Sequence, residues 1–283
     1  MSRKIAILTD STSSLYNVDH GLDNIFLIDI PCFIGEKIYK DFEKKGDHPF
    51  YEDLAKTDLV PKTSQPSVGE TLEKFDEIKE LGFTDIVYLP LSQHVSGTYQ
   101  NGFIAKDMVE GINVEVVDTL TTASILSDMA VASAKLAKEG KTVEEILANV
   151  EELKTKWGYY VTVDDLTSLV KNGRLSNAKS FIANLLRIKP VIKFTNGGKL
   201  VALKNVRHYK RALKNLVDII GEEINPETGS IHIAYTTNTE DLEIVKELVA
   251  ERFPNIPVRV YTLSSTVVAH VGLKVIGIGY VNY

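Results

Sequence analysis

The stretch Thr84–Leu91 (TDIVYLPL) runs directly into Ser92–Thr98 (SQHVSGT). A short apolar run rich in β-branched residues predicts a strand that is buried on both faces, as in a parallel sheet. The same pattern occurs at Lys4–Leu8 (KIAIL), which the hydroxyl-rich segment Thr9–Ser14 (TDSTSS) follows. Because each apolar run ends in a polar loop, we predict an α/β sheet whose carboxyl edge carries hydroxyl groups.

Helical segments lie between the predicted strands. The ranges Ser67–Leu81 and Thr142–Lys156 each open with a hydroxyl residue that glutamate follows three positions later. This is capping-box spacing, and the apolar residues behind it recur with a helical period. A third strand is predicted at Asn113–Asp118. The first part of the chain therefore fits three layers, with a parallel sheet between helices.

The pattern changes beyond Trp157. The segment Thr195–Gly198 (TNGG) is a strong hairpin signal between two β-branched runs, so the sheet here contains antiparallel strands. The elements predicted in this part are strands at Tyr159–Val163, Pro190–Phe194, Lys199–Val206, Ser230–Tyr235 and Pro257–Leu263, and helices at Ala178–Ile188, Tyr209–Gly221 and Glu240–Arg252. We predict two α/β domains, residues 1–160 with a parallel sheet in three layers and residues 161–283 with a mixed sheet.

Composition places the chain among ordinary globular proteins. Its 283 residues are 44% hydrophobic and 25% charged, with a net charge of −6 that argues against binding to nucleic acid or anionic membranes. The single cysteine, Cys32, cannot form an internal disulfide, and the N-terminus lacks the apolar core of a signal peptide. His270 and Lys274 interrupt the longest apolar stretch, Val267–Val281, which argues against a membrane span there. These features predict a soluble cytoplasmic protein.

Motifs of common enzymes fail on inspection. Gly140-Lys141-Thr142 resembles the end of a phosphate-binding loop, but no strand leads directly into it. Gly277-Ile278-Gly279 begins a dinucleotide-binding pattern that Asn282 breaks. Ser96 follows a strand as a hydrolase nucleophile does, yet glycine is missing from both positions that the motif requires. Zinc and calcium patterns are missing as well. The sequence therefore predicts no catalytic group, metal or cofactor.

Three loops rich in small hydroxyl residues remain, at Thr9–Ser14, Thr63–Ser67 and Ser92–Thr98. In open α/β sheets ligands bind beyond the carboxyl ends of the strands, where hydroxyls and free helix N–H groups suit an anion. Each loop taken alone equally fits helix capping and turn formation. Their number favours an anion site at one edge of the sheet and leaves the ligand open.

The full set of motifs resembles the DegV family, whose members bind fatty acids and serve as the lipid-carrying subunit of bacterial fatty acid kinase. The resemblance covers essentially the whole chain, and its most specific parts are TSQP and the downstream SGTY. The matching segments, in family order, are Thr9–Ser13 (TDSTS), Thr63–Pro66 (TSQP), Leu91–Tyr99 (LSQHVSGTY), Gly173–Ser176 (GRLS), Arg187–Pro190 (RIKP), Asn205–Arg207 (NVR) and Val268–Gly272 (VAHVG).

The resemblance implies a long-chain fatty acid, such as palmitate, as the ligand. The threonine of TSQP and the serine of VSGT, here Thr63 and Ser96, are expected to hold its carboxylate. The histidine of the AHxG segment, His270, and the arginine after the hairpin, Arg207, are expected near that head group. The chain departs from some relatives at Gln93-His94, where small residues are common, and this puts the shape of the pocket mouth or the acyl preference in doubt.

The resemblance also implies a carrier that is not itself an enzyme and that acts in lipid transport or fatty acid metabolism. A separate kinase subunit is the expected partner, and it would bring ATP and Mg²⁺ for acyl-phosphate formation. This agrees with the failure of every nucleotide motif in the chain. Stable insertion into a membrane is not expected.

A bound acyl tail requires an apolar tunnel between the domains. For any one residue that could line it, an ordinary core position is the better interpretation, and the sequence does not separate a tunnel wall from a packed interior. The candidates are Phe26, Ile28, Ile30 and Phe33 in the N-terminal part and Phe181, Ile182, Leu185 and Leu186 after GRLS.

Two other functions remain open on the residues alone. An enzyme acting on a small anionic metabolite, with Asp10, Ser96 and His270 as its catalytic constellation, would need a small polar cavity. A sensor of sugars or phosphates would need more than one basic residue at its site. Arg207 also fits a surface cation at a helix start, and His270 also fits a hydrogen-bonded core histidine.

Overall fold

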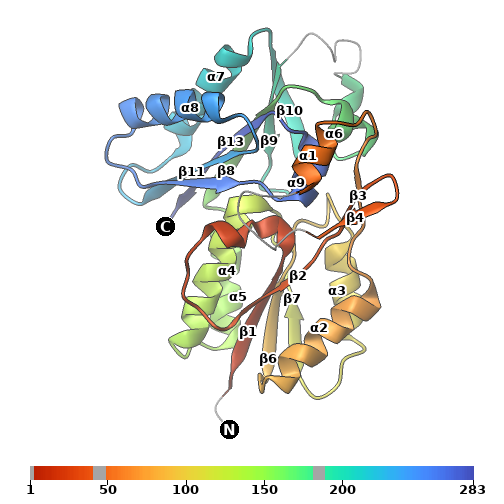
Figure 1. The fold of residues 1–283 in the computed structure, drawn as a ribbon. Coiled ribbons are helices and arrows are strands. Elements are labelled where there is room, and N and C mark those ends of the chain that lie inside the picture. Colours follow the sequence, from red (N-terminus) through yellow and green to blue (C-terminus); the bar gives the residue numbers. More distant parts are fainter. Residues whose placement is uncertain (1–2, 41–48, 181–188) are drawn as a thin grey trace.

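A parallel sheet of four strands forms the lower half of the molecule in the computed structural model, which describes residues 3–40, 49–180 and 189–283 (Figure 1). Its strand order is β2-β1-β6-β7, and all neighbouring strands are parallel. The strands are β1 (Ile5–Asp10), β2 (Ile25–Ile28), β6 (Asp85–Leu89) and β7 (Asn113–Val116). The prediction of a parallel sheet is confirmed.

Helices cover both faces of this sheet. The helices are α2 (Val68–Glu80) and α3 (Thr98–Lys106) on one face and α4 (Ala123–Lys138) and α5 (Val143–Leu153) on the other. Alternate residues of β1 point to opposite faces, so both faces are apolar. Both predicted capping boxes are present. The spacing of apolar residues did not predict helix α4. The alanines and serines of this helix are buried over most of its length, so it has no polar stripe that would mark it as amphipathic.

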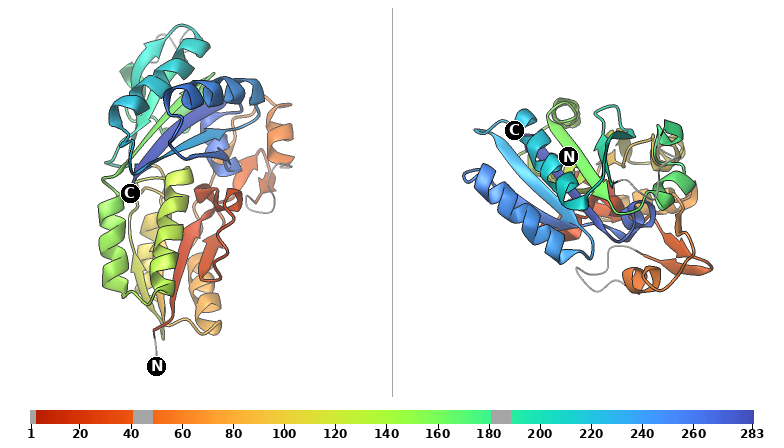
Figure 2. Two further views of the ribbon diagram at one scale, coloured as in Figure 1. Left: turned by 90° about the vertical axis from the view of Figure 1, so that its left-hand side faces the viewer. Right: turned by 90° about the horizontal axis from the view of Figure 1, so that it is seen from above.

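The upper half is a mixed sheet of six strands in the order β10-β9-β8-β13-β11-β12 (Figure 2). Only β11 and β12 are parallel, and the other pairs are antiparallel, as the predicted hairpin required. Helices α7 (Tyr209–Glu223) and α8 (Thr239–Arg252) cover its outer face. The strands are β8 (Trp157–Val163), β9 (Lys189–Phe194), β10 (Leu200–Val206), β11 (Gly229–Tyr235), β12 (Val258–Thr262) and β13 (Val275–Asn282).

Strand β13 was not predicted, because Gly277 and Gly279 interrupt its apolar pattern. Both glycines make room for the ring of Tyr159 on the neighbouring strand. A Cβ added to Gly277 would lie 2.9 Å from the Tyr159 hydroxyl, and one on Gly279 would lie 2.4 Å from its ring. The glycines are therefore a packing requirement of the sheet, and not a turn signal.

A small antiparallel sheet, β4-β3-β5, lies beside the boundary between the halves. It packs with α9 against the inner face of the six-stranded sheet, although it comes early in the chain. The remaining elements are β3 (Cys32–Ile34), β4 (Lys37–Tyr39), β5 (Lys62–Thr63), α1 (Pro49–Leu54), α6 (Thr167–Lys171), α9 (Ser265–Val271) and the 3-10 turns Ser11–Ser13, Leu15–Asn17 and Ala178–Ser180. Residue 160 lies inside β8, and the division into two domains there stays a prediction.

The tip of the β9–β10 hairpin docks onto the loop that follows β6. The Ser92 hydroxyl donates to the Gly198 carbonyl at 2.8 Å. A Cβ on Gly198 would meet Ser92 Oγ at 2.3 Å, and its φ of +76° lies in the region that glycine prefers. The hairpin thus approaches the parallel sheet closely only because residue 198 is glycine.

Replacing Gly198 by alanine is expected to lower the free energy of unfolding by roughly 1–3 kcal/mol, since both the positive φ and the close contact oppose a side chain. The matched control is Gly197→Ala, whose Cβ would have only Thr195 Oγ1 near it, at 3.8 Å. Denaturant titration of both variants measures the difference. If both variants lost the same free energy of unfolding, the close approach of Gly198 to Ser92 would not contribute to stability.

Candidate ligand-binding site

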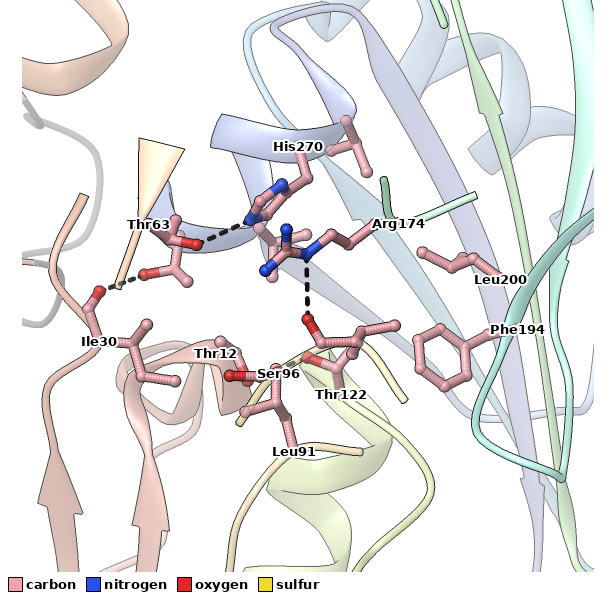
Figure 3. A pocket seen from close by; sticks show the side chains of 14 residues that line it. Thr12, Ile30, Thr63, Leu91, Ser96, Thr122, Arg174, Phe194, Leu200 and His270 are labelled. Carbon is pink, nitrogen blue, oxygen red and sulfur yellow. Dashed lines mark hydrogen bonds between the residues drawn. The ribbon is translucent and has the colours of Figure 1, made fainter. Parts of the chain in front are cut away.

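A cavity that is open at its mouth lies between the two sheets (Figure 3). Both halves of the molecule contribute to its wall, most of which is apolar. Phe194 and Leu200, from the β9–β10 hairpin, form one side of it. The residues that line it are Thr12, Ile30, Thr63, Leu91, Val95, Ser96, Thr122, Arg174, Phe194, Leu200, Thr266, Val267, His270 and Val271.

Three of the four predicted site residues line this cavity. Thr63 ends β5, His270 lies on α9, and Thr63 Oγ1 is 2.9 Å from His270 Nε2. Ser96 lies just before α3, where its hydroxyl contacts the Thr98 hydroxyl at 2.9 Å and accepts from the Thr98 amide at 3.3 Å. Thr63, Ser96 and His270 are thus brought to one cavity from three distant parts of the chain.

The fourth, Arg207, is placed elsewhere. It is exposed, it follows the end of β10, and it is not among the residues that line the cavity. Its predicted contact with the head group stays a prediction.

Arg174 is the cation that lines the cavity. Arg174 belongs to the GRLS motif that carries part of the family resemblance, but the motif alone predicts no role for it. Its Nε donates to the Val95 carbonyl at 3.2 Å and its Nη1 to the Asn172 carbonyl at 2.5 Å. No carboxylate within the described residues forms an ion pair with it. The charge of the guanidinium is therefore available to an anion in the cavity.

His270 is neutral at neutral pH. Burial, and after it the positive charge of Arg174, lowers the pKa of His270 from 6.5 to about 4. Its Nδ1 is buried and has no hydrogen-bond partner in the part of the chain that the structure describes. A neutral imidazole has one N–H donor, so a tautomer protonated on Nε2 donates to the Thr63 oxygen. The Thr63 hydroxyl then has its own proton free for an acceptor in the cavity.

Other hydroxyls in the wall are already engaged. The Thr122 hydroxyl donates to Thr12 Oγ1 at 2.9 Å, and the Thr12 hydroxyl donates to Asp10 Oδ1 at 2.5 Å. The Thr266 hydroxyl donates to the Ile30 carbonyl at 2.6 Å. These bonds hold the walls together, whereas Thr63 and Arg174 retain donors for a ligand. Ser96 also retains its donor when the Thr98 hydroxyl donates in the bond between them.

Asp10 does not line the cavity. Its Oδ1 also accepts from the Thr12 amide at 3.0 Å, and its Oδ2 accepts from the Leu91 amide at 2.6 Å. The buried carboxylate thereby caps the turn after β1 and fixes the loop after β6. This arrangement gives it a structural role and separates it from Ser96 and His270.

The predicted tunnel residues divide into three groups. Ile30 lines the cavity. Phe26 and Ile28 belong to the core between the parallel sheet and α2, where Phe26 packs edge-on against Phe83, and Phe33 of β3 is not part of the cavity wall. The candidates Phe181, Ile182, Leu185 and Leu186, with most of the predicted helix Ala178–Ile188, lie outside the described residues.

The described residues include no cluster of histidine, cysteine and carboxylate side chains that would hold a metal ion. None of their helices has the length and apolar character needed to cross a membrane.

Comparison with known proteins places this architecture in a family. A family model described as "Uncharacterised protein, DegV family" matches residues 4–282. A DegV domain-containing protein of Staphylococcus aureus is 31% identical over 287 residues, which cover 99% of this chain and 98% of the relative.

Solved structures agree with this assignment. The fatty acid binding DegV family protein of Streptococcus agalactiae superposes with a TM-score of 0.91 at 27% identity and covers 99% of both chains. The Bacillus subtilis protein described as DegV, a fatty acid binding protein, has a TM-score of 0.87 at 27% identity and covers 100% of both. The family model, the relative and the shared fold identify this chain as a member of the DegV family.

Proposed function

We propose that this protein binds a long-chain fatty acid in the cavity between its two sheets. The carboxylate lies at Thr63, Ser96 and Arg174, with His270 behind Thr63. One observation carries the proposal: a guanidinium that pairs with no carboxylate of residues 3–40, 49–180 and 189–283 faces, together with two hydroxyls, a cavity whose wall is otherwise mostly apolar. A ligand with one anionic end and a long apolar body is complementary to such a wall.

The head-group chemistry follows from the neutral state of His270. Its Nε2–H donates to Thr63, and Thr63 in turn donates to the carboxylate. Arg174 supplies a charge-assisted donor, and Ser96 adds a hydroxyl near the N-terminus of α3. The carboxylate remains near the mouth of the cavity, because these groups come from loops and element ends.

The tail provides most of the affinity. Burying about 15 CH₂ groups contributes on the order of 12 kcal/mol before the costs of binding, at roughly 0.8 kcal/mol each. A hydroxyl bonded to the carboxylate contributes about 1.5–3 kcal/mol. The polar groups therefore set the position and orientation of the ligand. Structural relatives at 27% identity that are described as fatty acid binding proteins support this interpretation.

A carrier of this kind presents the carboxylate of its bound fatty acid to another protein. We propose that a separate kinase subunit phosphorylates the bound fatty acid, and that this chain supplies no catalytic group. The neutral imidazole and the structural role of Asp10 favour this reading over an enzyme that uses Asp10, Ser96 and His270.

The direct test is mass spectrometry of an organic extract from the purified protein. A co-purified long-chain fatty acid, in amounts close to one per chain, is the expected result. A lipid-free extract, together with tight binding of a small phosphate or sugar, would favour the sensor or enzyme instead. The same preparation is expected to show no ATP turnover unless a kinase is added.

The hydroxyl contacts predict a loss of affinity on mutation. Thr63→Val and Ser96→Ala each remove one donor to a charged acceptor and are expected to weaken fatty acid binding by roughly 10- to 100-fold. Fluorescence titration with a fatty acid probe measures the change. Thr155→Val, at an exposed position outside the cavity, is the control and should leave the affinity unchanged. Wild-type affinity in both site variants would refute the assigned head-group position.

Either Arg174 or Arg207 could be the cation that contacts the ligand carboxylate, and mutation distinguishes the two. Arg174→Met is expected to weaken fatty acid binding by at least roughly 10-fold, because the ligand carboxylate loses its charged donor. Arg207→Met is expected to have a smaller effect, since Arg207 is exposed and outside the cavity wall. Titrations of both variants against one fatty acid decide between them. A larger loss of fatty acid affinity for Arg207→Met than for Arg174→Met would place the carboxylate at the loop that follows β10.

The low pKa of His270 predicts a pH effect on the ligand-free protein. Between pH 6.5 and about 4 the unfolded chain protonates this histidine and the folded chain does not, so the free energy of unfolding falls as the pH falls. The loss is on the order of 3 kcal/mol. In His270→Gln this part of the loss is expected to vanish, while at neutral pH stability stays near wild type and ligand-induced stabilisation decreases.

Thermal unfolding across this pH range, with and without fatty acid, measures both effects. The exposed His208, changed to glutamine, provides the control and should retain the wild-type pH profile. A His270→Gln protein that loses stability at neutral pH but keeps its fatty acid affinity would make His270 a purely structural residue.

A further inference from the structure

A second polar cluster joins the two halves away from the candidate site. Asp128, on α4 of the lower half, is 6% exposed. Its Oδ1 accepts from Arg259 Nη1 of β12 at 2.9 Å, and its Oδ2 lies 3.1 Å from His232 Nε2 of β11. The hydroxyl of Tyr283 also donates to Oδ2. One carboxylate therefore contacts two strands of the upper sheet and the last residue of the chain.

The environment keeps this carboxylate ionised. Burial alone would raise the pKa of Asp128, but His232, Tyr283 and Arg259 outweigh it and hold the pKa below its usual value. His232 is fully buried and packs against the ring of Tyr261 at 5.2 Å, so its position is fixed by the sheet. The cluster is thus a buried charge with partners arranged around it.

The ion pair between Asp128 and Arg259 joins the two halves of the molecule. Apart from the contact of His232 with the same carboxylate, no other ion pair between described residues joins a helix packed on the four-stranded sheet to a strand of the six-stranded sheet. Asp128 is buried, whereas the Arg259 side chain is 49% exposed, so the pair itself adds little net stability. Loss of Arg259 is nevertheless costly, because the carboxylate of Asp128 stays buried without its charged partner. The pair therefore selects one relative arrangement of the halves more than it stabilises either of them.

Helix α4 connects this cluster to the cavity. Its N-cap residue, Thr122, lines the cavity and bonds to Thr12. Asp128 follows six residues later, about 9 Å along the helix axis. The cavity wall also comes from both halves, so parting them at α4 widens the space that holds the ligand.

We propose that Asp128, His232, Arg259 and Tyr283 form a clasp that keeps the two halves closed over the cavity and sets the rate of ligand exchange. The proposal deepens the proposed function, on which its ligand readout rests. When the clasp is intact, the halves stay in one arrangement and a bound fatty acid leaves slowly. When Asp128 loses its charge, the closed arrangement is less favoured and exchange is faster.

The first measurement needs no ligand. Pulsed electron paramagnetic resonance reports the distance between spin labels at Glu144→Cys on α5 and Glu247→Cys on α8, in a Cys32→Ser background. Both label positions are exposed, one on each half. The labelled protein with an intact clasp is expected to give one narrow distance distribution. Asp128→Asn is expected to broaden it or add a longer component.

The second measurement is the dissociation rate of cis-parinaric acid, a fluorescent fatty acid. Asp128→Asn and Arg259→Gln are expected to raise this rate by roughly 3- to 30-fold, with a smaller rise for Tyr283→Phe, which removes one hydrogen bond and keeps the charges. The control pair is Asp218→Asn and Arg252→Gln, which breaks an ion pair inside the upper half. These controls should leave both the rate and the distance distribution unchanged.

The outcomes separate the two proposals. If Asp128→Asn broadens the distribution of spin-label distances but neither the wild-type protein nor any variant binds parinaric acid, the proposed clasp is supported and the fatty acid assignment is refuted. If Asp128→Asn fails to fold, Arg259→Gln and Tyr283→Phe carry the test. If the clasp variants only lower the thermal midpoint, with distances and dissociation rates as in the intact protein, the cluster is structural and the clasp is refuted.

Discussion

The hydrogen bond between Thr63 and His270 joins residues 207 positions apart and depends on how the small sheet and α9 meet at the boundary between the halves. Thr63 reaches it because β5 pairs with β3 beside the boundary between the halves, and His270 reaches it because α9 packs against the same small sheet. Nearby, Arg174 adds a positive charge that no carboxylate of the described residues pairs with. We propose that these groups create a place for one anion inside a largely apolar space.

The parallel sheet and its capped helices followed from the sequence, because strands buried on both faces and capping boxes are local signals. The same holds for the β9–β10 hairpin. Helix α4 and strand β13 were missed, since the first is buried over most of its length and the second carries glycines that serve Tyr159. Their patterns reflect tertiary packing, which a periodicity argument does not contain.

The candidate site divides in the same way. Thr63, Ser96 and His270 come from motifs that resemble the family, and the structure brings them to one cavity. Arg174 was not assigned, although its GRLS motif was recognised, because an isolated arginine in a loop carries no sign of what it faces. Which of several apolar residues lines the cavity depends on how two sheets meet, and sequence does not separate a lining residue from a core residue.

Nuclear magnetic resonance of a bound fatty acid labelled with ¹³C at its carboxyl carbon tests the central claim most directly. We expect the bound carboxyl to stay ionised well below the pH at which the free acid protonates, because Arg174 and the hydroxyls favour its charged form. Thr63→Val should shift the carboxyl resonance and leave the terminal methyl resonance in place. A bound carboxyl that titrates like the free acid, and that does not respond to Thr63→Val or Arg174→Met, would contradict a carboxylate site in this cavity.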